Sequence, residues 1–284
     1  MSPSNADSGR RELFRAYLRG RGATYAYVLG GGAAFVLGAW RQSPLIMAAG
    51  PAAVVLLVAA VAALSAKRLA AERFYAHFAS SLGLACWPRF ELLPLTPLLG
   101  AGDRRWCEHW MQGELPGEPA FAGGLGQFVF EEIERRGETK ITHVTERRRF
   151  TLCVIELEPS LPFFKGLYVR PRRGVFPEGK NWIRSSDSRS LQLESMAFGD
   201  RYEVRTASDQ DELVVRQLLS PSLVGWLAEH PLAPCFEVKA GTLAVYLPRV
   251  LEDAGNLTFF LDAARHLAGG VLRETDEALA RRAA

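Results

Sequence analysis

The sequence contains few of the residues that usually build catalytic or metal centres. Its 284 residues include four cysteines and five histidines, and none of them stands in a Cys-x-x-Cys pair or a His-Glu-x-x-His motif. The glycine-rich phosphate loops G-x-G-x-x-G and G-x-x-x-x-G-K-[ST] are also missing. We therefore expect no metal and no cofactor, and a non-enzymatic protein is favoured over an enzyme.

Charge is absent from two long runs near the start of the sequence. Residues 23–40 and 44–66 contain no Asp, Glu, Lys or Arg, and three residues separate them. At about 1.5 Å per residue, such helices reach across a hydrocarbon core of roughly 30 Å. Basic residues precede the first run and follow the second, so the positive-inside rule places both ends in the cytoplasm. These features predict a transmembrane hairpin, and the alternative is a buried helical hairpin in a soluble core.

Small residues recur every four positions in the first run, at Gly30, Ala34 and Gly38. Such a face lets helices approach closely in lipid. It can serve contact between the two helices of the hairpin, or a homo-oligomer.

The remainder of the chain has a balanced charge. Of 34 basic and 31 acidic residues, six and two precede residue 67, which leaves 28 basic and 29 acidic residues in 67–284. A general nucleic-acid binder needs a strong basic field. We therefore expect no nucleic acid among the partners.

Four regions follow from these patterns. They are a basic cytoplasmic tail (1–22), the hairpin (23–66), a juxtamembrane helix with a Pro/Gly-rich packed segment (67–124), and a cytoplasmic domain (125–284). Within the packed segment, residues 104–112 are interpreted as a short helix.

In the last region, apolar and polar residues alternate with the period of a β-strand. Runs of β-branched and aromatic residues with period two predict strands at 127–133, 149–157, 166–170, 189–194 and 201–205. Helices are predicted at 209–219, capped by Asp209, and at 221–228, capped by Ser220. Ala240–Gly241 predicts a tight hairpin between 235–239 and 242–247, and a helix follows from residue 256. The predicted fold class is α+β: a transmembrane hairpin, then an antiparallel-sheet domain with a two-helix insertion and a C-terminal helix.

Arginines supply one candidate site. Arg170, Arg172, Arg173 and Arg184 gather around a predicted strand end and a polar loop. Guanidinium groups bind phosphate and carboxylate through paired hydrogen bonds, so these residues are candidates for an anionic lipid headgroup or a phosphorylated ligand. The alternative is a solvated loop.

Several motifs resemble a bacterial membrane-protein family, the domain-of-unknown-function 3137 family. They are Phe164, Gly166 and Leu167; Glu194, Ser195 and Phe198; Tyr202 and Val204; Asp209; and Leu218 to Pro221. Tyr202 stands where the family pattern has phenylalanine. The resemblance implies a bacterial inner-membrane location and a compact cytoplasmic domain behind a two-helix anchor, and it brings no established activity.

The leading hypothesis is a multi-pass inner-membrane protein whose cytoplasmic domain binds a partner protein through Glu194, Phe198 and Trp226. The second hypothesis is recognition of an anionic lipid or phosphorylated ligand by the four arginines. The third is a membrane-tethered enzyme with an unrecognised site. Expected partners are therefore membrane lipid and a protein whose identity the sequence does not give.

Overall fold

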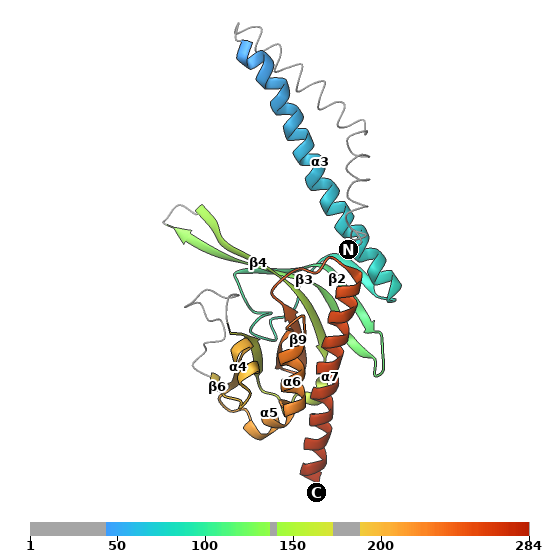
Figure 1. The fold of residues 1–284 in the computed structure, drawn as a ribbon, viewed down its shortest axis with the longest axis vertical. Coiled ribbons are helices and arrows are strands. Elements are labelled where there is room, and N and C mark those ends of the chain that lie inside the picture. The colour runs from blue at the N-terminus through green and yellow to red at the C-terminus, as the bar shows by residue number, and fades with distance from the viewer. Residues whose placement is uncertain (1–43, 137–140, 173–187, 284) are drawn as a thin grey trace. The chain divides into compact units, whose positions relative to one another are not determined.

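The computed structural model describes residues 44–136, 141–172 and 188–283 (Figure 1). The chain divides into two compact units, Met1–His77 and Phe78–Ala284. The boundary falls inside the helix α3 (Pro44–Ser81). The second unit, here called the sheet unit, contains every strand that the structure describes.

The elements of the sheet unit follow α3 in a fixed order. They are β1 (Ala85–Phe90), β2 (Arg104–Leu115), β3 (Phe121–Arg136), β4 (Ile141–Glu156), η1 (Glu158–Ser160), β5 (Leu167–Pro171), β6 (Ser188–Leu191), α4 (Met196–Arg201), β7 (Tyr202–Ala207), α5 (Glu212–Leu218), α6 (Pro221–Glu229), β8 (Cys235–Lys239), β9 (Thr242–Leu247) and α7 (Ala254–Ala283).

These strands form one nine-stranded antiparallel sheet in the order β1-β2-β3-β4-β9-β8-β5-β7-β6. The β8–β9 hairpin is confirmed, with Lys239 paired to Thr242 across the turn. Both turn residues have positive φ, 51° at Ala240 and 67° at Gly241, as a two-residue hairpin turn requires. The hairpin joins the two halves of the sheet, because β9 pairs with β4 and β8 pairs with β5.

Tyr202 of β7 shows which face of the sheet the helices cover. Its ring stacks on Phe198 of α4 with 4.9 Å between centroids, and its hydroxyl donates to the carbonyl oxygen of Leu227 in α6 at 3.4 Å. α7 packs on α5 and β4. Adjacent residues of a strand point to opposite faces, so Glu203 lies on the other face.

A segment without regular secondary structure, residues 93–102, covers that second face. The backbone N–H of Leu98 donates to Glu237 of β8 at 2.8 Å, and Leu98 and Leu99 are fully buried. We call residues 93–102 the cover segment. The sheet unit is therefore layered, with helices on one face and the cover segment over part of the other.

The predicted transmembrane hairpin is corrected by the structure. Residues 44–66 do form a helix, the first part of α3, but no helix in the described part of the chain is long and apolar enough to cross a membrane. The prediction relied on the absence of charge. Nine alanines, two prolines, one glycine and one serine make up more than half of these residues, and such small residues contribute little apolar surface.

The helix also continues without a break through charged residues, among them Lys67, Arg68 and Glu72. The transmembrane part of the predicted fold class and the multi-pass inner-membrane localisation with cytoplasmic termini are therefore wrong. The first predicted span, residues 23–40 with Gly30, Ala34 and Gly38, and the basic tail 1–22 lie outside the described residues.

Residues 104–112 are not a helix but most of the strand β2. Period-two alternation is hidden there because the pairing with β3 shifts between Glu108 and Met111, where His109 has a φ of 54°. Such a bulge places two residues opposite one and breaks the sequence pattern of a strand. The helix α4 was also missed, although Ser195 caps it by accepting the backbone N–H of Phe198.

Candidate functional site

Strand pairing places a row of polar side chains on the face of the sheet away from α4 and α6. Glu237 on β8 lies opposite Tyr168 on β5, and Tyr168 lies opposite Arg205 on β7. Arg170 lies opposite Glu203. Directly opposite residues share a face, so these side chains point the same way. We call Glu237, Tyr168, Arg170, Glu203 and Arg205 the polar row.

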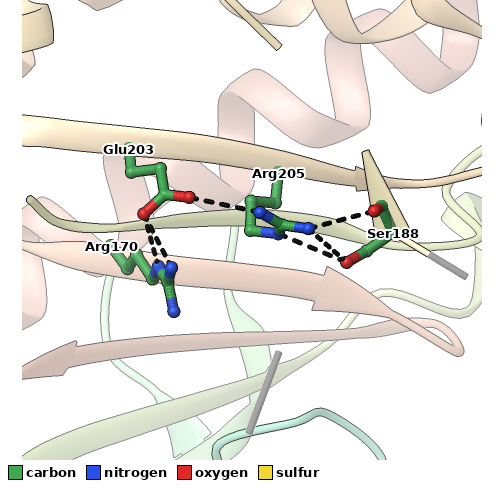
Figure 2. A network of polar contacts seen from close by, with 4 residues as sticks. All are labelled: Arg170, Ser188, Glu203 and Arg205. Carbon is green, nitrogen blue, oxygen red and sulfur yellow. Dashed lines mark hydrogen bonds and ion pairs between the residues drawn. The ribbon is translucent and has the colours of Figure 1, made fainter. Parts of the chain in front are cut away.

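Ion pairs join the outer part of the polar row (Figure 2). Nε and an Nη of Arg170 donate to Oε2 of Glu203 at 3.2 and 2.6 Å, and the Arg170 side chain is only 5% exposed. Arg205 donates to the other carboxylate oxygen at 3.3 Å. Its guanidinium also donates to the hydroxyl and the carbonyl oxygen of Ser188. One carboxylate thus bridges two arginines on adjacent strands.

The arginines keep Glu203 ionised. Burial by itself would raise the pKa of this carboxyl group, but the hydrogen bond and charge of Arg170, followed by those of Arg205, outweigh burial and lower the pKa below its ordinary value. This part of the row therefore holds two guanidinium groups and one carboxylate, with a net charge of +1.

Glu237 occupies the inner end of the row and is fully buried. Its Oε2 accepts the Leu98 N–H, and the Thr96 side chain also bonds to the carboxyl group. Among the described residues, Oε1 has no hydrogen-bond partner, and neither has the buried hydroxyl of Tyr246 on β9. Burial raises the pKa of Glu237 to about 7, since the bonds from Leu98 and Thr96 and the charge of Arg170 offset it only in part.

A pocket of about 480 Å³ lies beside the outer end of the polar row, between β6 and α4. We call it the β6–α4 pocket. Its lining includes Arg172, Leu193, Glu194, Met196 and Asp200. Glu203 also lines it, so the ion-paired carboxylate borders this space.

The structure separates the three residues predicted to bind a partner. Glu194 is exposed and lines the β6–α4 pocket. Phe198 lines the same pocket but is buried, because its ring stacks on Tyr202. Trp226 lies on α6, where its ring packs at a tilt against those of His230 and His266, and it does not line the pocket.

The four predicted anion-binding arginines do not form one described site either. Arg170 is buried against Glu203, whereas Arg172 lines the pocket and donates to the carbonyl oxygen of Gly199 at 2.6 Å. Arg173 and Arg184 lie outside the described residues.

Sequence reasoning missed Glu237, Glu203 and Tyr246. Glu237 stands between Phe236 and Val238, which is the ordinary alternation of a half-exposed strand, so no pattern in the sequence signalled its burial. Glu203 gave no signal either, since its partner Arg170 is 33 residues away and meets it only through strand register.

The described part of the chain contains neither a cluster of metal-ligating side chains nor an exposed reactive thiol. No group of three His, Cys, Asp or Glu residues is placed there to hold a metal ion. Cys107, Cys153 and Cys235 are buried, and burial raises the pKa of the Cys153 thiol to about 12. These thiols are held in the neutral form, which is the less reactive one.

Two histidines lie between α6 and α7. The His230 ring stacks on Phe259 with 4.8 Å between centroids, and Trp226 contacts both His230 and His266 at about the same separation. Nδ1 of His230 accepts the N–H of Leu232, so this nitrogen carries no proton in the structure. The His230 ring at this contact is therefore neutral.

We expect acid to weaken this contact. Burial lowers the pKa of both histidines, with a further lowering of His230 by His266 and of His266 by Arg273. Since the folded-state pKa lies below the unfolded value near 6.5, the stability from the neutral rings is full above pH 6.5 and is lost as the pH falls further. His266→Phe keeps a ring against Trp226, so its melting temperature should fall less than the wild type's between pH 7 and pH 5. An equal fall in both proteins would contradict this.

Comparisons with known proteins add no relative: no protein-family model, no curated protein and no solved structure is significantly similar to the chain. The resemblance to the domain-of-unknown-function 3137 family therefore stays a prediction that rests on the quoted motifs.

Proposed function

We propose that the chain is a non-enzymatic binding protein whose sheet unit docks a segment of a partner protein at the β6–α4 pocket. The observation that carries this proposal is the composition of the pocket. Within one space of about 480 Å³ it combines an exposed methionine, Met196, with Leu193 and the charged groups of Arg172, Glu194 and Asp200.

Met196 favours a protein over a small molecule as the occupant. Its side chain is 84% exposed, although methionine is usually buried. Methionine and arginine are enriched in protein–protein interfaces, where a flexible thioether adapts to a partner surface and charged groups form the rim. Sites for small molecules instead enclose most of the ligand.

The polar row supports binding at the pocket rather than anion recognition by Arg170. That arginine is 5% exposed and paired with Glu203, so a ligand phosphate would have to displace a buried ion pair. Among the pocket residues, Glu194 and Asp200 together outweigh the charge of Arg172, which also disfavours an anion.

Site-specific photocrosslinking tests the proposal. A photoreactive phenylalanine derivative replaces Met196 in one full-length variant and Leu213 in another. Leu213 is a matched control because it is also a large exposed residue, 60% exposed, but belongs to α5 and does not line the pocket. We expect a discrete protein adduct from position 196 that position 213 does not give. The same adducts from both positions, or none from position 196, would contradict the proposal.

A further inference from the structure

We propose that the cover segment, residues 93–102, is a pH-responsive cover over the sheet, which opens more often when the carboxyl group of Glu237 loses its proton. The inference concerns the inner end of the polar row rather than the β6–α4 pocket at its outer end, and it does not depend on the proposed function.

The closed position rests on few polar contacts and on apolar burial. The backbone N–H of Leu98 donates to Glu237, which lies 139 residues further along the sequence, and the side chains of Leu98 and Leu99 are fully buried. Leu93, in contrast, is 70% exposed at the start of the segment. At its other end Gly102 has a φ of 75°, a backbone conformation that side chains rarely adopt. The centre of the segment is therefore docked on the sheet, its first residue is exposed, and its last residue is a glycine in a left-handed conformation.

The Glu237 carboxyl group makes this docking sensitive to its own charge. In the closed position one oxygen accepts a hydrogen bond from the cover segment, while the other oxygen is buried without a hydrogen-bond partner among the described residues. A protonated carboxyl tolerates that environment far better than a carboxylate, because an unsolvated charge is costly in a protein interior. Opening the segment would bring water to the charge, so ionisation favours the open state.

Neighbouring charges do not cancel this effect. Arg170 on β5 attracts the carboxylate, but it is already paired with Glu203. Lys239, on the same strand, lowers the pKa less than Arg170 does. The other facing groups, Tyr168, Tyr246 and Cys235, are titratable but neutral near pH 7, because burial raises the pKa of each. Their positions follow from the pairing of β5, β8 and β9.

The open state exposes the side chains of Leu98 and Leu99 and the sheet face beneath them. If the open state restores an ordinary carboxyl pKa near 4.5, the shift to about 7 in the closed state fixes the size of the effect. The opening equilibrium should then increase about tenfold between pH 6 and pH 8.

Hydrogen exchange measures this opening directly. In the wild-type full chain, the protection factor of the Leu98 amide, corrected for the intrinsic rate at each pH, should fall about tenfold from pH 6 to pH 8. The amide of Val245 in the central strand β9 should stay more protected than that of Leu98 at both values, which identifies local opening. Equal protection of Leu98 and Val245 with a parallel change would mean global unfolding and would overturn the proposal.

Two isosteric variants assign the effect to one carboxyl group. Glu237→Gln keeps an oxygen to accept the Leu98 N–H but cannot ionise, so its Leu98 protection should be the same at pH 6 and pH 8. Glu229→Gln removes an exposed carboxylate on the helix α6, outside the polar row, and should keep the tenfold change. A wild-type Leu98 amide without pH dependence, or a dependence that survives in Glu237→Gln, would overturn the inference.

Discussion

Glu237→Gln should raise the free energy of unfolding of the sheet unit by about 3 kcal/mol at pH 8 and change it little at pH 4. The wild-type carboxyl group has a pKa of about 7 when folded, against 4.5 when unfolded. A difference of that size corresponds to about 3 kcal/mol, at 1.36 kcal/mol for each pKa unit. Chemical denaturation followed by tryptophan fluorescence measures the effect at both pH values.

The sign follows from proton counting. Between pH 4.5 and pH 7 the folded chain binds a proton at Glu237 that the unfolded chain has released, so stability falls as the pH rises through this window. Glutamine has nearly the shape of the protonated carboxyl group and cannot release a proton, so this loss of stability is absent from the variant. A variant less stable than the wild type at pH 8 would show that the buried carboxylate is compensated in the folded state.

Gly123→Ala should lower the free energy of unfolding by about 3 kcal/mol or more. A Cβ atom at this position of β3 would lie 2.2 Å from the carbonyl oxygen of Val154 on β4. The obstacle is backbone rather than the flexible end of a side chain, so the two long central strands would have to separate locally. Overpacking in a core typically costs about 1–3 kcal/mol, and a backbone clash lies at the upper end or beyond.

Gly225→Ala is the matched control and should have the opposite sign. Gly225 lies inside α6, and a Cβ atom there meets nothing within 4 Å. Alanine in a helix interior is more stable than glycine by roughly 0.5–1 kcal/mol. If both alanine variants were destabilised equally, the close approach of β3 and β4 at Gly123 would not be the cause.

The sequence predicted best those elements that local residues determine. The β8–β9 hairpin follows from a turn that needs positive φ, and α6 begins at Pro221 after the Ser220 cap, as predicted. The start of α5 was misplaced, because Asp211 rather than Asp209 caps it, whereas Asp209 pairs with Lys165. Two aspartates two positions apart satisfy the same capping rule, and only tertiary contacts separate their roles.

Elements that depend on distant partners could not be predicted in this way. β2 became recognisable only through its pairing with β1 and β3, since the bulge at His109 hides its alternation. The arginine site illustrates the same limit. Arg170 belongs to an arginine-rich sequence, yet strand register places it beside Glu203 and turns an expected ligand contact into a buried ion pair.

Crosslinking from position 196 in a charge-reversed pocket tests the central proposal most directly. The photoreactive residue at position 196 is combined with Glu194→Arg in one chain and with Glu229→Arg in another. Both glutamates are exposed, but only Glu194 lines the β6–α4 pocket. Docking of a partner segment predicts that Glu194→Arg lowers the adduct yield at least tenfold while Glu229→Arg leaves it unchanged. Equal yields from the two chains would contradict a binding site at this pocket.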